Sequence, residues 1–206
     1  MRIKSVLSQM GLADKFNEVY FPLKALHDTP ERLHHDWSHI VECLNALYEA
    51  KSLFSERVFL HLFFAILLHD VVYSATAPSG ENEVKSAEFA DEFLKKLDFI
   101  SSLRIERVHK LILSTANHQG TDIQEQWMGD IDCAVLGADW ERYQRYLQAI
   151  RFEYACFSDK QYQQGRLDFL KGMQERQIFQ TPYFYEKYEK QAKLNIEKEI
   201  EMLEKS

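Results

Sequence analysis

The sequence predicts an all-α fold, and three observations support this. Only 7 Gly and 4 Pro occur among 206 residues, so residues that interrupt helices are sparse. Almost no stretch alternates apolar and polar residues in the way of a half-exposed strand, and apolar residues recur at spacings of three and four instead. With 46% hydrophobic residues, the chain is expected to form one helical bundle domain over residues 1–206.

Helices are expected along most of the chain, separated by short breaks. They cover about 2–20, 36–51, 55–73, 82–97, 102–117, 123–137, 139–157, 159–172 and 182 to the C-terminus. Thr-Pro pairs at 29–30 and 181–182 are typical of helix starts, and Ser55 is a third capping residue. The breaks "SATAPSGEN" (74–82) and "NHQGTD" (117–122) contain the turn-forming residues.

Two helices have a clear apolar face. Ile40, Leu44 and Leu47 share one side of the helix that starts at Asp36 or Ser38 and runs to Lys51. The last helix has a longer stripe, consisting of Tyr185, Tyr188, Ala192, Ile196, Ile200 and Leu203. These faces are expected to pack in the core.

The most apolar segment, "VFLHLFFAILL" (58–68), is followed directly by His69 and Asp70. Its 11 residues are fewer than the roughly 20 that span a bilayer, so a buried helix is expected rather than a membrane helix. An ionised carboxylate beside such a core is costly unless it is paired, hydrogen-bonded or bound to a metal. The His-Asp pair is therefore a candidate site.

Charge and cysteine content restrict the class of protein. The formal net charge of −7 argues against generic nucleic-acid binding. The three cysteines have no metal-ligand spacing and are expected to be reduced and mostly buried. The N-terminal segment has no continuous apolar stretch of the kind found in secretory signals, and a cytoplasmic protein that does not bind membranes is expected.

Histidines and aspartates gather near the expected helix ends. His35 and His39 are four residues apart, His118 lies at the "NHQG" break, and "MGDIDCAVLGAD" (128–139) contains three aspartates. Imidazole and carboxylate together are ligands for Mn, Fe, Co, Ni or Zn. The alternatives are a hydrogen-bonded His69–Asp70 pair, a polar histidine patch and aspartates that cap helices.

The order of these residues resembles the HD superfamily of metal-dependent phosphohydrolases, in which a lone His precedes an adjacent His-Asp pair and a distal Asp. Eight segments together resemble a bacterial subgroup of predicted metal-dependent HD phosphohydrolases: "RLHHDWSHI", "LLHDVVY", "NEVKSA", "LILSTANH", "DIDCAVLG", "IRFEY", "GRLDFL" and "AKLNIEKEI". They extend from about residue 32 to 203. The chain departs from that subgroup at His34, where a tyrosine is usual.

The resemblance implies a bundle of the HD-domain type with one divalent ion, which would be Mn, Ni, Co, Fe, Zn or Mg. Its ligands would be His39, His69, Asp70 and Asp132. The expected activity is hydrolysis of a small phosphomonoester or nucleotide by a water that the metal activates, and Asp70 would also orient that water.

Four further residues are candidates for supporting roles. His118 is expected to bind a second metal or protonate the leaving group, or else to be a helix-end histidine. Glu83 is a candidate base, or a carboxylate that favours a helix N-terminus. His35 is expected to contact phosphate or to hydrogen-bond behind the metal ligands. Arg151 is a candidate phosphate ligand, or part of an ion pair with Glu153 or a neighbouring helix.

Two other functions are compatible with the sequence. Some HD-fold enzymes are oxygenases with two irons, but these need further histidines, and His109 and His118 are too far apart on one helix to meet easily. A non-catalytic HD module that binds a nucleotide or a protein is the other alternative. The intact ligand set disfavours it, and resemblance in fold does not define a substrate.

Overall fold

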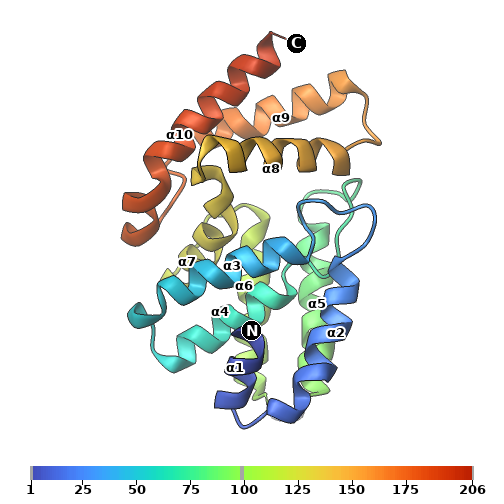
Figure 1. The fold of residues 1–206 in the computed structure, drawn as a ribbon, viewed down its shortest axis with the longest axis vertical. Coiled ribbons are helices and arrows are strands. Elements are labelled where there is room, and N and C mark those ends of the chain that lie inside the picture. Colours follow the sequence, from blue (N-terminus) through green and yellow to red (C-terminus); the bar gives the residue numbers. More distant parts are fainter. Residues whose placement is uncertain (1, 98–99, 206) are drawn as a thin grey trace.

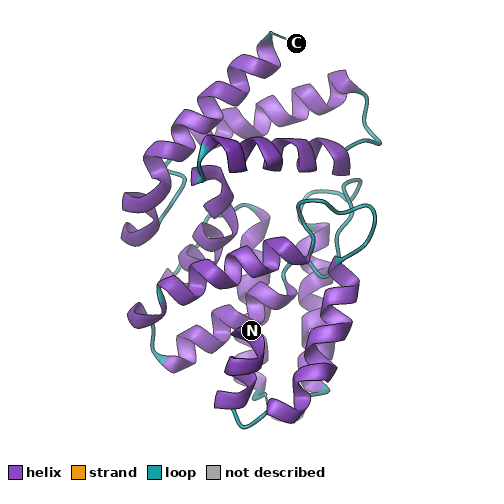
Figure 2. Cartoon of the chain, viewed as in Figure 1, coloured by secondary structure: helices purple, strands orange, loops and turns teal. Residues whose placement is uncertain are grey.

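The computed structural model describes residues 2–97 and 100–205, and their regular secondary structure is entirely helical (Figure 2). No strand occurs in these ranges, so the predicted all-α class is confirmed. The α-helices are α1 (Arg2–Gln9), α2 (Phe16–His27), α3 (Trp37–Glu49), α4 (Glu56–Leu68), α5 (Glu81–Lys95), α6 (Ser102–Leu113), α7 (Ile123–Asp132), α8 (Trp140–Glu153), α9 (Asp159–Gln174) and α10 (Pro182–Glu204).

The helices are arranged in two groups (Figure 1). Helices α8, α9 and α10 lie at one end of the molecule, and α1 to α6 lie at the other, with α7 between them. The 3₁₀ turn Cys133–Gly137 follows α7 and packs against α10. A Cβ atom at Gly137 would lie 2.5 Å from the Cβ of Tyr188, so this close approach requires glycine.

Helix α4 is at the centre of the core. All of its residues from Phe59 to Leu68 are buried. A helix that is apolar on every side has to be surrounded, and α3, α5, α6 and α7 all pack against it. The predicted buried helix is confirmed, but it ends at Leu68 rather than near Tyr73. His69 and Asp70 therefore stand at its C-terminal end, where the chain leaves the helix.

The predicted first helix over residues 2–20 is wrong in its extent. The chain turns at Gly11, whose φ of +75° is a left-handed conformation that other residues rarely adopt. The amide of Leu12 donates to the carbonyl of Leu7 across this turn. Two helices, α1 and α2, result instead of one.

The helix start predicted at Thr29 and Pro30 is also wrong, because the residues between α2 and α3 form an irregular loop. The Asp36 side chain accepts hydrogen bonds from the amides of Ser38 and His39, and α3 begins after it. This loop is held by long-range hydrogen bonds to Glu153 of α8 and to the loop after α4, which local sequence signals do not report. The starts predicted at Ser55 and Thr181 are confirmed by their side-chain caps.

The predicted apolar faces are mostly confirmed. Ile40, Leu44 and Leu47 are all buried on α3. On α10, Ala192, Ile196 and Ile200 are buried, but Tyr185 is 48% exposed and was wrongly placed in the stripe. Phe184 fills the buried position, because the face of α10 that contacts the core is rotated by one residue at its start.

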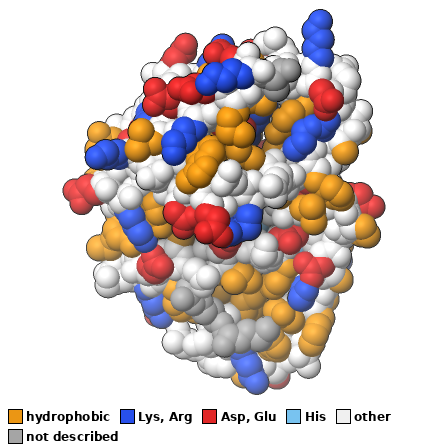
Figure 3. Space-filling view, turned by 45° about the horizontal axis from the view of Figure 1, so that its top comes forward, with side chains coloured by type: hydrophobic (Ala, Val, Ile, Leu, Met, Phe, Trp, Pro, Cys, Tyr) orange, Lys and Arg blue, Asp and Glu red, His pale blue; other side chains and the backbone are white. Residues whose placement is uncertain are grey.

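The surface in view shows side chains of both charges interspersed with hydrophobic ones (Figure 3). Cys43 and Cys133 are buried and Cys156 is exposed, which agrees with the expectation that the free thiols are mostly buried. Among the described residues, no helix has both the length and the apolar character that crossing a bilayer would require.

His27 gives a prediction about acid stability. It is fully buried, its Nδ1–H donates to the carbonyl of Leu23, and its Nε2 has no hydrogen-bond partner among the described residues. Burial lowers the pKa of His27 from 6.5 to about 4. Between pH 6.5 and pH 4, His27 binds a proton in the unfolded chain but not in the folded protein. The free energy of unfolding should therefore fall as the pH falls, by about 3 kcal/mol in total.

The variant His27→Gln cannot titrate, so its free energy of unfolding should depend less on pH between 6.5 and 4. Urea denaturation of both proteins at a series of pH values measures the difference. Parallel curves for the two proteins would show that His27 does not contribute to acid lability.

Candidate metal centre

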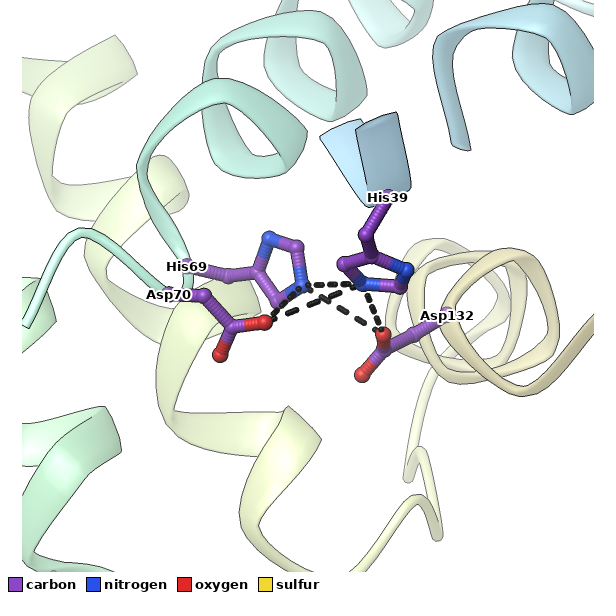
Figure 4. A group of neighbouring side chains, drawn as sticks. All are labelled: His39, His69, Asp70 and Asp132. Carbon is purple, nitrogen blue, oxygen red and sulfur yellow. Dashed lines mark hydrogen bonds and ion pairs between the residues drawn. The ribbon is translucent and has the colours of Figure 1, made fainter. Parts of the chain in front are cut away.

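Four predicted ligands come together at one point, although they come from three helices. His39 lies in the first turn of α3, His69 and Asp70 follow α4, and Asp132 is the last residue of α7. Figure 4 shows the two imidazoles and two carboxylates directed toward each other. One ligand atom from each residue lies within 4.8 Å of the other three.

Four of five distances between these atoms match the spacing of ligands around one ion, and the fifth, between His39 and Asp70, is longer. His39 Nε2 lies 3.2 Å from His69 Nε2, 3.0 Å from Asp132 Oδ1 and 3.7 Å from Asp70 Oδ2. His69 Nε2 lies 3.1 Å from Asp70 Oδ2 and 3.3 Å from Asp132 Oδ1. Ligand atoms about 2.1 Å from a common ion are roughly 3.0–3.4 Å apart. The four side chains therefore fit a divalent metal ion with little rearrangement.

The end of α4 explains how adjacent residues reach the same point. On a continuing helix, His69 and Asp70 would be about 100° apart around the axis. His69 follows the last residue of α4 and still has helical backbone angles, and the chain turns at His69 and Asp70. The Nδ1–H of His69 donates to the carbonyl of Ile66 at 3.0 Å, which leaves the Nε2 lone pair directed at the cluster.

The cluster is buried and its charges are strongly coupled. His39 and His69 are 3% and 1% exposed. Burial works against ionisation of Asp70 and Asp132, but His69 outweighs it and lowers the pKa of both carboxyl groups. Burial also disfavours a charged His69, and the two carboxylates overcome this and raise its pKa well above 6.5. A proton on His69 thus neutralises part of the acidic charge, and a metal cation would take over that role.

Arg32 holds the backbone of the turn that carries Asp70. Its guanidinium donates to the carbonyls of Asp70 at 2.7 Å, Val71 at 3.3 Å and His35 at 3.4 Å. Nothing in the local sequence distinguishes this arginine from a surface residue, so its role was not predicted. It links the loop before α3 to the loop after α4, which lie side by side in Figure 1.

His35 is held by Glu153 at the end of α8. The Nδ1 of His35 lies 2.6 Å from Glu153 Oε2, and the other carboxylate oxygen accepts from the amides of Leu33, His34 and His35. Burial opposes ionisation of Glu153, but these bonds lower the pKa of its carboxyl group. Glu153 was weighed only as a partner for Arg151, because no sequence signal connects residues about 120 positions apart.

His118 contacts the cluster directly. Its Nε2 lies 2.9 Å from Asp132 Oδ2, the carboxylate oxygen that does not face His39 and His69. The φ of His118 is +52°, an uncommon conformation for a residue other than glycine. The structure thus brings His118 to the site, and its role in catalysis stays a prediction.

His34 packs between Tyr146 and His39, with ring centroids 4.7 Å and 4.9 Å away. It is buried, and burial lowers its pKa well below 6.5. The hydroxyl of Tyr146 accepts from Arg166, which in turn donates two hydrogen bonds to Glu199. A buried network therefore extends from α10 to the back of the His39 ring.

The remaining two predicted residues differ in their position. Glu83, in the first turn of α5, lines the same cavity as Asp70 and Asp132. Arg151 pairs with Asp159 at 2.6 Å and donates to two backbone carbonyls, and it is not among the residues that line this cavity. Its predicted contact with phosphate has no support from this position.

A cavity of about 470 Å³ opens onto the cluster. Asp70, His118 and Asp132 form one part of its wall, and His35 and Glu83 are also exposed to it. The part formed by α8, α9, the turn between them and the loop after α4 is rich in aromatic side chains, which are Tyr73, Tyr146, Tyr154, Phe157, Tyr162 and Phe169. The volume is within the range of cavities that hold small organic ligands.

Comparison with known proteins identifies no relative. No family model matches the chain, and no curated protein or solved structure matches it. The likeness to HD phosphohydrolases therefore stays a prediction from the ordered sequence segments. What the geometry itself defines is a buried cluster of two histidines and two aspartates that is able to bind a metal ion.

The raised pKa of His69 predicts that metal affinity depends on pH. Below that pKa an incoming cation has to displace a proton, so affinity should rise with pH, about tenfold per unit for each proton released. Titration of the apo-protein with Zn²⁺ or Mn²⁺ between pH 6 and 8 measures this slope. A dissociation constant that does not change over this range would contradict the proposed ligand set.

Proposed function

We propose that the protein is a divalent-metal-dependent phosphohydrolase that acts on a small phosphomonoester or nucleotide. The observation that carries the proposal is the convergence of four metal-ligating atoms at the wall of a cavity large enough for an organic phosphate. The ordered segments that resemble HD phosphohydrolases support the same class of reaction.

His39, His69, Asp70 and Asp132 would hold the ion. When bound, a divalent ion polarises a phosphoryl oxygen and lowers the pKa of a water molecule, which provides a nucleophile near neutral pH. Asp70 faces the cluster through Oδ2, and its Oδ1 makes no hydrogen bond to a described residue. That second oxygen would orient the attacking water, which is the role that the resemblance implies for Asp70.

Other residues around the cavity would assist the reaction. His118 restrains Asp132 through the carboxylate oxygen that lies outside the cluster, and it is also close enough to the cavity to meet the substrate. Glu83, in the first turn of α5, lines the same cavity, where a carboxylate would act as a base through a water molecule. Either role requires the substrate to be present, so both are proposals.

The charge of the cavity favours a substrate with a single phosphate group. Among the described residues that line it, Arg166 is the single Lys or Arg. Its guanidinium already donates to both oxygens of Glu199 and to Tyr146. A di- or triphosphate would find little positive charge beyond the ion, whereas one phosphoryl group would be neutralised by the ion and the neighbouring histidines.

No described contact favours the oxygenase alternative. His109 pairs with Asp91 at 3.1 Å and does not line the cavity, so it supplies no additional ligand to the cluster. His35, the other histidine that could contribute to a second iron site, lines the cavity but is not part of the cluster of ligand atoms. The phosphohydrolase is therefore the better-supported function.

We predict that the metal-loaded protein hydrolyses p-nitrophenyl phosphate or a nucleoside monophosphate, and that Asp132→Ala loses the activity. The loss in kcat/KM should be at least about 1,000-fold, since several kcal/mol of transition-state stabilisation disappear with the ion. Protein loaded separately with Mn²⁺, Co²⁺, Ni²⁺, Fe²⁺, Zn²⁺ and Mg²⁺ would be assayed against a panel of phosphate monoesters.

The matched control is His109→Ala, which removes another imidazole–carboxylate pair but leaves the cluster intact. It should retain the activity of the wild type. A wild-type protein that holds its metal but hydrolyses no phosphomonoester would contradict the proposed function.

A further inference from the structure

The two oxygens of the Glu153 carboxylate have different partners. Oε1 accepts hydrogen bonds from the amides of Leu33, His34 and His35, at 2.8, 2.7 and 2.9 Å. Among the residues that the structure describes, Oε2 has one hydrogen-bond partner, the Nδ1 of His35, at 2.6 Å. The three hydrogen bonds to Oε1 are sufficient to connect the loop before α3 to the end of α8. The contact through Oε2 is therefore an additional constraint on one imidazole ring.

That contact defines which ring nitrogen of His35 carries a hydrogen. The carboxylate can only accept hydrogen bonds, so Nδ1 has to donate. Nε2 is then the ring atom left for other partners, and no hydrogen bond joins it to a described residue. A carboxylate behind an imidazole acts in the same way in hydrolases that depend on one histidine tautomer.

The plane of the ring is restrained as well. The His35 ring stacks on Tyr73 with a centroid distance of 4.1 Å and an interplanar angle of 26°. Arg32 donates to the carbonyl of His35 and also lies over the Tyr73 ring, 5.5 Å from its centroid. The His35 side chain is still 20% exposed, and it lines the cavity together with Asp70 and Asp132.

We propose that Glu153 is a positioning residue: it holds His35 with its hydrogen on Nδ1 and its ring plane fixed, so that the Nε2 lone pair accepts a hydrogen bond from a hydroxyl group of the substrate or from the attacking water at the metal centre. The inference rests on the proposed function for the identity of the ligand. Helix α8 would then contribute to the site through Glu153, which is about 120 positions away in the sequence from the histidine that it orients.

The variant Glu153→Gln tests this role. If the amide oxygen of Gln replaces Oε1 at the three backbone amides, its NH₂ group faces Nδ1 of His35, which must then accept. The substitution therefore keeps the loop attached but moves the hydrogen of His35 to Nε2. We expect kcat to fall about 10- to 100-fold, while the metal content per chain stays the same.

Glu189 provides a matched control in the same protein. It is also a buried glutamate that accepts hydrogen bonds from backbone amides, those of Ile178 and Phe179, but no imidazole contacts it. Glu189→Gln should lower the melting temperature to a similar extent as Glu153→Gln and leave kcat within about twofold of the wild type. Equal losses of kcat in the two variants would overturn the proposal.

Two further readouts separate positioning from a general loss of structure. In a His35→Ala background, Glu153→Gln should cause no additional loss of kcat, because the residue through which it acts is absent. A further loss as large as that in the wild-type background would overturn the proposal. Nitrogen-15 NMR of the histidine side chains should show the hydrogen of His35 on Nδ1 in the wild type and on Nε2 in Glu153→Gln.

The NMR readout does not depend on enzymatic activity. A wild-type protein without phosphatase activity would overturn the proposed function, and the tautomer of His35 would still decide whether Glu153 fixes the ring. If His35 has the same tautomer in Glu153→Gln as in the wild type, Glu153 does not position it and the inference fails.

Discussion

The charge balance of Asp70 and Asp132 constrains the structure around them. Two carboxylates with little solvent contact repel each other, and burial alone would keep them protonated. His69, about 3 Å from both carboxylates, reverses this and lowers the pKa of both carboxyl groups. Such an arrangement is costly to build in a core, and a bound cation offsets that cost more completely than a proton on His69.

The surrounding fold explains how this cluster is kept in place. Helix α4 is buried on all sides, so its C-terminal end is fixed relative to α3 and α7, which supply the other two ligands. The loops that follow α2 and α4 lack regular structure, but Arg32 ties one to the other. Glu153 ties the first of them to α8. The site is thus supported by both groups of helices in Figure 1.

Local signals in the sequence were sufficient for most of the helices, whereas the set of four clustered ligands was expected from the resemblance to HD phosphohydrolases. Helical periodicity and capping residues such as Ser55 and Thr181 report on structure within one turn, and these predictions are confirmed. The loop at residues 29–36 was mistaken for a helix start because its conformation depends on contacts with residues about 40 to 120 positions away. Glu153 and Arg32 were missed for the same reason, since a lone Glu or Arg has no local signature of a buried role.

The measurement that tests the central claim most directly is the metal content per chain of the wild type and of Asp70→Ala, purified without added metal or chelator. About one divalent ion per wild-type chain, lost in the variant while the helical content stays the same, is the result the account predicts. If both proteins are empty and remain empty when metal is supplied, His69 and Asp70 are a buried ion pair and the metal centre does not exist.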